Sequence, residues 1–225
     1  MTLQHVDIVF QIIAFLFAIS IHESAHAWTA NRRGDPTARM LGRVSLNPIR
    51  HIDPVGTILL PAIAMFMHFP VIGWAKPTPV DPRNFKNPVL DDVLTAVAGP
   101  VSNFLTATIA TMALAGIAVL APGGRMIVHG AMSGFLTSNS ALVPISIMLF
   151  ELITINVLLG VFNLIPVPPL DGSHVLRHFL TENVRRIYDT VGMFGLMLLV
   201  FFGGNLLWAL IRPVLNVYIS ILMSV

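Results

Sequence analysis

The sequence predicts an all-α polytopic membrane protein with about four full transmembrane helices. Hydrophobic residues make up 55% of the 225 residues, charged residues only 11%, and long uncharged stretches recur along the chain. Soluble domains carry about 25% charged residues, so a soluble fold does not account for this composition. The length predicts a single membrane domain, residues 1–225, without room for a separate soluble domain of ordinary size.

Charge and cysteine content exclude other classes of protein. The formal net charge of +2 is small, and no basic run is interleaved with aromatic residues, so no nucleic-acid partner is expected. The chain contains no cysteine, so any metal site must use His, Asp or Glu side chains. The expected partners are the lipid bilayer and other membrane proteins, and the sequence leaves open whether copies of the chain form a homo-oligomer.

The first predicted span is residues 6–30, which are mostly apolar and contain Trp28, a residue type common at membrane interfaces. The segment that follows, residues 31–53, is rich in arginine, and basic loops beside spans usually stay in the cytoplasm. The end of this span is therefore expected on the cytoplasmic side. The arginines of this segment are Arg32, Arg33, Arg39, Arg43 and Arg50.

Residues 54–85 are predicted to form a re-entrant element or a β-hairpin. Their apolar part, residues 54–72, is interrupted by prolines and has basic segments on both sides. A single crossing would place one basic flank outside, against the charge rule, whereas irregular backbone is tolerated where protein or a water cavity covers it. The proline-rich stretch 75–82 suits an extended edge strand.

Three further spans and a short C-terminal half-helix complete the predicted fold. The spans are residues 93–120, 143–165 and 190–211, and residues 214–225 are too short to cross a membrane. The third span contains Glu151, a carboxylate that lies far along the helix from the cytoplasmic end. It is expected either to make a structural hydrogen bond or to occupy an interfacial position.

The strongest functional signal is the sequence His22-Glu23-Ser24-Ala25-His26 near the end of the first span. On a helix His22 and His26 project from one face, so both imidazoles can bind one Zn²⁺. Glu23 is rotated about 100° from His22, which suits a general base that acts on water without ligating the metal. Ionisable residues in an apolar segment are costly unless they perform a task, which argues against a chance match.

Asp171 is the natural third ligand for this metal. It follows a run of prolines that ends the third span on the cytoplasmic side, at the depth expected for His22 and His26. Two histidines and one carboxylate leave one position for water, as catalytic zinc sites require. Asp171 could also cap the next helix, a role compatible with ligation.

Other polar residues carry weaker signals. Asn103 in the second span suits either a helix–helix hydrogen bond or a role in the site. His174 and His178 are also four residues apart, but no Glu lies between them and they are expected to be solvated surface residues. His51 is the residue to consider if Asp171 proves not to bind the metal.

Taken together, these motifs resemble the site-2 protease family of intramembrane zinc metalloproteases, peptidase family M50. The resemblance covers the chain from about residue 19 to residue 180, and Gly73-Trp74-Ala75-Lys76-Pro77 looks like its compact prokaryotic branch, which has no PDZ or nucleotide-sensing domain. The matching motifs are His22-Glu23-Ser24-Ala25-His26, Ala98-Gly99-Pro100-x-x-Asn103 and Asn163-x-x-Pro166-x-Pro168-x-x-Asp171-Gly172.

The resemblance implies a site-2 protease core with one Zn²⁺ per chain, bound by His22, His26 and Asp171. It implies that Glu23 is the catalytic base and that Asn163 holds the substrate backbone or the developing oxyanion. The substrate would be a transmembrane helix of another protein, cut by regulated intramembrane proteolysis in a prokaryotic inner membrane, with the active site near the cytoplasmic side. Further candidates for substrate or structural support are Asn103, Trp74, Pro77, Pro166 and Pro168.

The expected mechanism is hydrolysis of a peptide bond by zinc-activated water, with Glu23 as the general base. The main alternative is a non-proteolytic membrane zinc transporter, sensor or scaffold that uses the same ligands. Glu23 favours the enzyme, because a transport or structural site has no need for an unligated carboxylate beside its ligands. How cleavage is regulated stays open.

Overall fold

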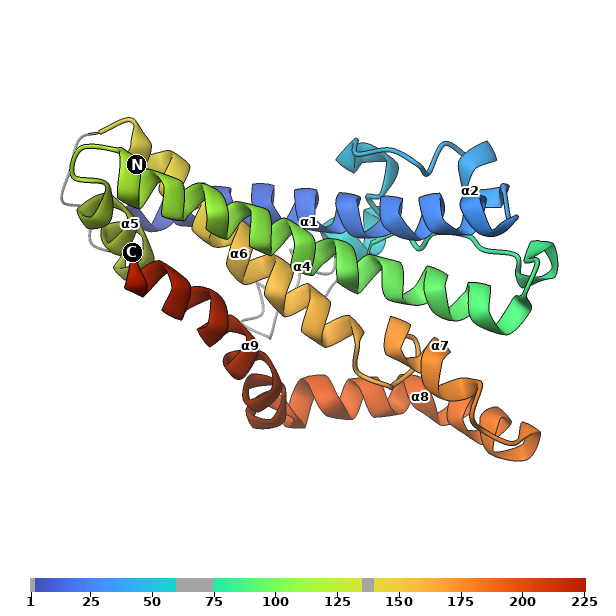
Figure 1. Ribbon diagram of the computed structural model, residues 1–225. Helices are drawn as coiled ribbons and strands as arrows, with labels where there is room; N and C mark the ends of the chain where they lie inside the picture. Colours follow the sequence, from blue (N-terminus) through green and yellow to red (C-terminus); the bar gives the residue numbers. More distant parts are fainter. Residues whose placement is uncertain (1–2, 60–74, 135–139) are drawn as a thin grey trace. The chain divides into compact units, whose positions relative to one another are not determined.

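The computed structural model describes residues 3–59, 75–134 and 140–225, and within these ranges the backbone forms helices and loops without strands (Figure 1). Four of the described helices are long and apolar enough to cross a membrane. The predicted class, an all-α polytopic membrane protein, is therefore confirmed. These helices are α1 (Leu3–Arg33), α4 (Pro88–Leu120), α6 (Leu142–Asn163) and α9 (Gly204–Ser224).

The other elements connect these four membrane-crossing helices. An amphipathic helix, α8, covers Glu182–Phe202. The remaining elements are α2 (Thr37–Met40), α5 (Gly124–Ser133), α7 (Asp171–Arg177), the 3₁₀ turns η1 (Pro48–Arg50) and η3 (Pro82–Asn84), and the short π-helix η2 (Pro54–Leu59).

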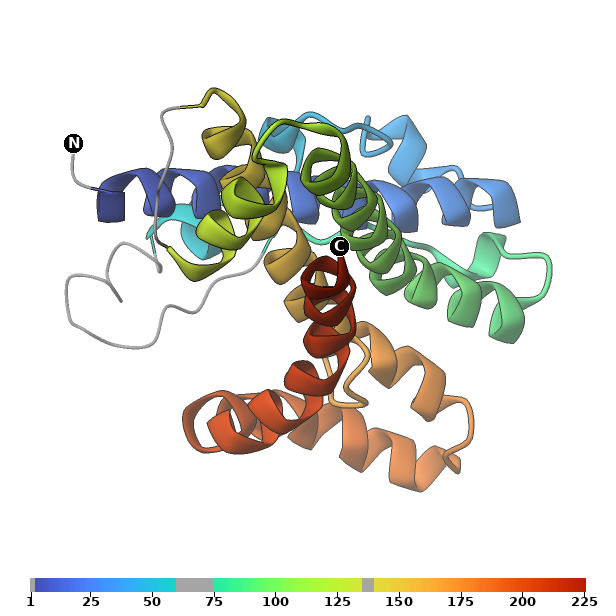
Figure 2. The same ribbon diagram turned by 60° about the vertical axis from the view of Figure 1, so that its left-hand side comes forward.

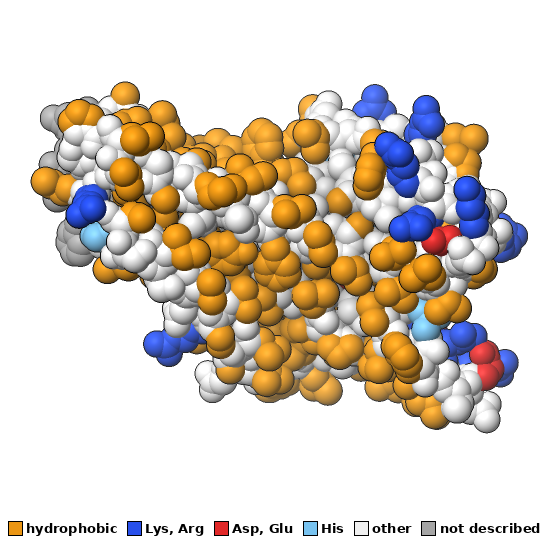
Figure 3. Space-filling view, in the orientation of Figure 1, with side chains coloured by type: hydrophobic (Ala, Val, Ile, Leu, Met, Phe, Trp, Pro, Cys, Tyr) orange, Lys and Arg blue, Asp and Glu red, His pale blue; other side chains and the backbone are white. Residues whose placement is uncertain are grey.

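The surface of the long helices is apolar. Ile12 on α1 and Leu105 and Ile109 on α4 are exposed although they are large hydrophobic residues, as lipid-facing side chains are in a membrane protein. Figure 3 shows hydrophobic side chains over most of one face, whereas Lys and Arg side chains gather around α2 and the adjoining ends of α1 and α4. The protein is thus a multi-pass membrane protein.

The chain divides into two compact units. The first unit contains residues 1–18, 103–162 and 206–225, and the second contains residues 19–102 and 163–205. Helices α1, α4, α6 and α9 each contribute residues to both units.

The core of the first unit combines alanines with larger apolar residues. Ala107 and Ala110 of α4 are buried together with Ile153 and Val157 of α6, and small side chains let two helix backbones approach closely. Asn103 is fully buried beside this core, and its amide donates a hydrogen bond of 2.8 Å to Asn156 Oδ1. Asn103 therefore links α4 to α6 within the first unit. This is the helix–helix hydrogen bond that was one of the two predictions for Asn103.

Glu151 also makes a hydrogen bond inside the first unit. Its Oε1 accepts a bond of 3.3 Å from the side-chain amide of Gln11 on α1. The expectation of a structural hydrogen bond for this carboxylate is therefore confirmed.

The end of the chain differs from the sequence-based prediction of a span at 190–211 and a half-helix at 214–225. Helix α8 ends at Phe202, and α9 runs without interruption through Pro213 as a 21-residue helix. The break falls at Gly203, the C-cap of α8, whose N–H donates a 2.8 Å hydrogen bond to Leu199 O and whose ψ of 13° departs from the helical value. A proline removes only one backbone hydrogen bond, a loss that membrane helices tolerate.

Only part of the predicted element at 54–85 falls within the described residues. Residues 54–59 form η2, and residues 75–81 run as an irregular segment that is joined to the preceding loop by a hydrogen bond of 2.9 Å from Lys76 N to His51 O. The apolar residues 60–74, including Trp74, lie outside the described part.

In the second unit, α1 and α4 run antiparallel and side by side, as Figures 1 and 2 both show. The loop after α1 is fixed by Asp35, whose fully buried side chain accepts hydrogen bonds from Thr37, from the Asn84 amide and from the backbone N–H of Asp81. Burial by itself raises the pKa of Asp35, but these hydrogen bonds outweigh it and hold the pKa below its ordinary value.

Replacing Asp35 with Asn tests this junction. The Asn amide cannot accept from the N–H of Asp81, so we expect a loss of about 1–3 kcal/mol in the free energy of unfolding at neutral pH. Because the folded pKa of Asp35 is lowered, its contribution is present above its ordinary pKa and is lost as the pH falls through the folded value. Wild type and variant should therefore converge once the pH is below the folded pKa. Thermal unfolding in detergent measures this.

Asp53→Asn is the matched control, because Asp53 accepts its loop hydrogen bonds from Val55 and Gly56 through Oδ1 alone, an atom that Asn keeps. A stability difference between wild type and Asp35→Asn that persists unchanged in acid would contradict the role given to the ionised carboxylate.

Candidate metal centre

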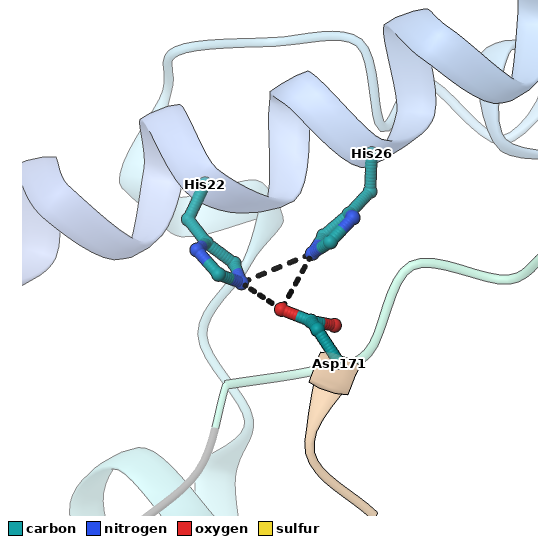
Figure 4. Close-up of side chains that lie close together, drawn as sticks. All are labelled: His22, His26 and Asp171. Carbon is teal, nitrogen blue, oxygen red and sulfur yellow. Dashed lines mark hydrogen bonds and ion pairs between the residues drawn. The ribbon is translucent and has the colours of Figure 1, made fainter. Parts of the chain in front are cut away.

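His22 and His26 on α1 and Asp171 at the start of α7 point toward one another in the second unit (Figure 4). Nε2 of His22 lies 3.0 Å from Nε2 of His26, and Asp171 Oδ2 lies 3.1 Å from the first nitrogen and 3.4 Å from the second. Among the described residues, no other group of His, Cys, Asp and Glu side chains brings three ligand atoms together in this way.

These three atoms fit a zinc ion. Ligand atoms at about 2.0–2.1 Å from a tetrahedral Zn²⁺ lie roughly 3.3 Å from one another, close to the spacing of the three atoms here. Both imidazoles are buried, and Asp171 Oδ2 is a buried oxygen that accepts no hydrogen bond in the described structure. A buried carboxylate oxygen in that position is costly without a cation, so the donor set itself favours metal binding.

The ionisation of Asp171 agrees with this fit. Burial raises the pKa of this carboxyl, but the adjacent imidazoles of His26 and His22 outweigh burial and hold the pKa below its ordinary value. Asp171 is therefore present as the carboxylate, which is the form that binds a cation.

Helix α4 orients the two imidazoles. Nδ1 of His26 lies 2.7 Å from the carbonyl oxygen of Thr95, so Nδ1 carries the proton and the lone pair of Nε2 points toward the centre of the group. Gly99 lies against both rings, because a Cβ at this position would be 2.6 Å from His22 Nε2 and closer still to His26 Nε2. Only glycine allows α4 to approach the rings this closely.

The loop before Asp171 is held against α8. The carbonyl of Pro166 accepts a hydrogen bond of 2.9 Å from the hydroxyl of Tyr188. Pro168 packs against Gly192, where an added Cβ would lie 2.5 Å from Pro168 Cβ. Both prolines thus shape the segment that carries Asp171 into α7.

Glu23 is held by a residue that the sequence alone did not single out, Thr78. Oε2 of Glu23 accepts hydrogen bonds from the Thr78 backbone N–H at 3.0 Å and from its hydroxyl at 2.7 Å. The hydroxyl also lies 3.1 Å from the Glu23 carbonyl. The only signal in the sequence is that Pro77 and Pro79 have no N–H, which leaves Thr78 as the one backbone donor of these three residues.

The remaining predicted residues lie in other environments. Asn163 is half-buried at the end of α6, in the same unit as the metal group, and Pro77 is exposed. His51 is buried with Nε2 lying 2.7 Å from Ser45 O, and it does not belong to the metal group. His174 and His178 were both predicted to be solvated surface residues. The side chain of His174 is 40% exposed and that of His178 is 20% exposed, and both imidazoles also contact the buried Asp92.

The fold is that of a membrane protein, and two histidines and one aspartate converge in it. Together these features define a membrane protein with a site for a catalytic metal. The family model described as peptidase family M50 matches residues 10–202. The chain belongs to this family, and it is a zinc metalloendopeptidase of the membrane.

Two curated relatives support this assignment. YwhC of Bacillus subtilis (strain 168), whose name describes a candidate zinc metalloprotease, is 38% identical over 210 residues, which cover 91% of this chain and 85% of the relative. Rip2 of Mycolicibacterium smegmatis (strain ATCC 700084 / mc(2)155), with the same description, is 25% identical over 215 residues, which cover 95% of this chain and 71% of that protein. No solved structure matches the chain.

The contact between Gly99 and the imidazoles leads to a prediction for Gly99→Ala. The methyl group would overlap both rings and push them apart, so we expect zinc affinity to fall by at least tenfold, as when a supporting group of a metal site is lost. Competition with a chromogenic chelator measures the affinity of the purified protein.

Gly116→Ala is the matched control on the same helix, because a Cβ at Gly116 meets no atom within 4 Å and alanine favours a helix over glycine. Zinc affinity should stay within about twofold of wild type in this variant. Equal zinc affinities for Gly99→Ala and Gly116→Ala would show that the close approach of α4 is not required.

Proposed function

We propose that the protein is an intramembrane zinc endopeptidase of the site-2 protease type, acting as one domain over residues 1–225. Its substrates are transmembrane segments of other membrane proteins, cut within or near the bilayer. The observation that carries this proposal is the convergence of His22, His26 and Asp171 at one point, with Glu23 next to His22 on a membrane-crossing helix. Three protein ligands leave the fourth tetrahedral position to water.

The bound Zn²⁺ supplies Lewis-acid chemistry, lowering the pKa of water and polarising the scissile carbonyl. The protein residues move the protons. Thr78 fixes Oε2 of Glu23, so Oε1 takes the proton of the attacking water and later delivers it to the leaving nitrogen. Asn163 donates a hydrogen bond to the substrate backbone or to the negative charge on its oxygen.

The substrate must reach this site as extended backbone. A helical peptide hides its carbonyls in hydrogen bonds, so the scissile segment has to unwind before water attacks. The irregular segment 75–81 lies beside Glu23 through Thr78, which makes it the place where an extended substrate strand aligns.

The active site faces the cytoplasmic side of a prokaryotic inner membrane in this proposal. The arginine-rich segment after α1 supports this orientation, because basic loops remain cytoplasmic. The histidines on the last turns of α1 then lie just below that surface, where water reaches them through a polar path.

Cysteine labelling tests the orientation, and the chain has no natural cysteine to interfere. In Lys76→Cys, the exposed position 76 should react with a membrane-impermeant maleimide in inside-out vesicles and remain unlabelled in intact cells or spheroplasts. Labelling from the external side would overturn the proposed orientation.

The role of Glu23 is tested with Glu23→Gln on a tagged single-span substrate in liposomes. The amide cannot accept the proton of water, so cleavage should fall by at least about 10²-fold while bound zinc stays at the wild-type level.

Thr78→Val, which keeps the backbone donor but loses the hydroxyl, should lower kcat with little change in KM. Metal content and cleavage rate are measured on the same preparation.

Glu151→Gln provides the control, because Glu151 is another carboxylate of a membrane-crossing helix and its Oε1 acceptor for Gln11 is kept. Its cleavage rate should stay within about twofold of wild type. If Glu23→Gln cleaved as fast as wild type, Glu23 would not be the general base.

A further inference from the structure

A second cluster of ionisable residues lies in the same unit as the metal centre and is not explained by it. Asp92 of α4 is nearly buried, at 9% exposure, although it is a carboxylate. Its Oδ1 lies 3.2 Å from Nδ1 of His174, and its Oδ2 lies 2.8 Å from Nε2 of His178. Both oxygens are therefore bonded to imidazoles that belong to α7 and its C-terminal cap.

The direction of these hydrogen bonds is fixed by chemistry. An ionised carboxylate only accepts, so Nδ1 of His174 and Nε2 of His178 carry protons toward Asp92. A buried carboxylate that loses its partners strongly destabilises a protein. Separating Asp92 from the two imidazoles would therefore cost free energy, so the three residues hold α4 and α7 together. Within the described residues they do not form a second metal group, because their ligand atoms do not converge as those of the first group do.

The spacing of the residues places this cluster and the metal centre on matching helix faces. On α4, Asp92, Thr95 and Gly99 are separated by three and four residues and share one face. Asp92 contacts His174 and His178, the carbonyl of Thr95 orients His26, and Gly99 lies against both imidazoles. One stripe of α4 thus contacts both α7 and α1.

The same spacing occurs on the other helix. Asp171, His174 and His178 are again separated by three and four residues, and the backbone of His178 continues the right-handed helical conformation of α7. The face of α7 that presents Asp171 to the histidines of α1 is therefore the face that Asp92 ties to α4.

We propose that Asp92 is a positioning residue for the zinc centre, which anchors α7 to α4 through His174 and His178 and so fixes Asp171 opposite His22 and His26. The inference rests on the proposed function of Asp171 as a zinc ligand. A helix of only seven residues has little stability of its own, so its orientation depends on such an anchor.

Zinc affinity, measured by chelator competition, tests this inference without any need for substrate. Asp92→Ala removes both acceptors, and we expect the apparent Kd for zinc to rise about tenfold, the lower range for loss of a supporting group. In the Asp171→Ala background the same substitution should change the Kd by less than about twofold, because the ligand that Asp92 positions is already gone.

Asp91→Ala is the matched control, since Asp91 is also buried on α4 but its carboxylate faces other partners, the backbone N–H of Asn87 and Arg33 at the end of α1. Thermal unfolding with a chelator present identifies variants that lose zinc because they do not fold.

If Asp92→Ala does not fold, a second pair of variants, His178→Leu and His178→Gln, tests the same contact. Gln keeps an N–H donor near the position of Nε2, whereas Leu does not. Only His178→Leu should weaken zinc binding.

The outcomes separate the two proposals. If Asp171→Ala weakens zinc binding but Asp92→Ala does not, the positioning role of Asp92 is wrong and the zinc site stands. The same conclusion follows if Asp92→Ala changes the zinc Kd equally in the wild-type and Asp171→Ala backgrounds. Equal zinc binding by His178→Leu and His178→Gln also overturns it. If Asp171→Ala leaves zinc affinity unchanged, the proposed ligand set fails, and the role of Asp92 fails with it.

Discussion

The close contact between α4 and the two imidazoles of α1 is the constraint on which the rest of the site depends. Gly99 lets the helix backbone come against His22 and His26, and the carbonyl of Thr95 then fixes the tautomer of His26. Neither effect uses a side chain of α4 as a ligand. The backbone of α4 holds the two imidazoles in place, and Asp171 of α7 completes the ligand set.

Several polar groups of this apolar chain are paired with one another, because each would be costly alone in a membrane. Glu23 is paired with Thr78, and Asn103 with Asn156. Asp171 Oδ2 is a buried oxygen without a hydrogen bond that lies 3.1 Å from Nε2 of His22 and 3.4 Å from Nε2 of His26. What distinguishes the metal-binding position is that three ligand atoms converge there, whereas the structural pairs join two polar groups at a time.

The sequence predicted the parts of the site that depend on local spacing. His22, Glu23 and His26 follow from the helical period, and Asp171 follows from the depth at which two spans end. Thr78 and Asp92 could not be predicted, because their roles depend on tertiary contacts with residues 55, 82 and 86 positions away. The division between α8 and α9 was also missed, because the prediction placed the helix end at Pro213, whereas the structure ends α8 at the C-cap Gly203 and keeps Pro213 inside α9.

Zinc K-edge X-ray absorption on the purified, reconstituted protein tests the central claim most directly. Wild type should show four nitrogen or oxygen ligands at about 2.0–2.2 Å, with the scattering pattern of two imidazoles. Asp171→Ala should lose one protein ligand and bind zinc more weakly, with both imidazoles retained. The account would be contradicted if Asp171→Ala kept the zinc ligands and the zinc affinity of wild type. It would also be contradicted if the zinc coordination shell of wild type lacked two imidazoles.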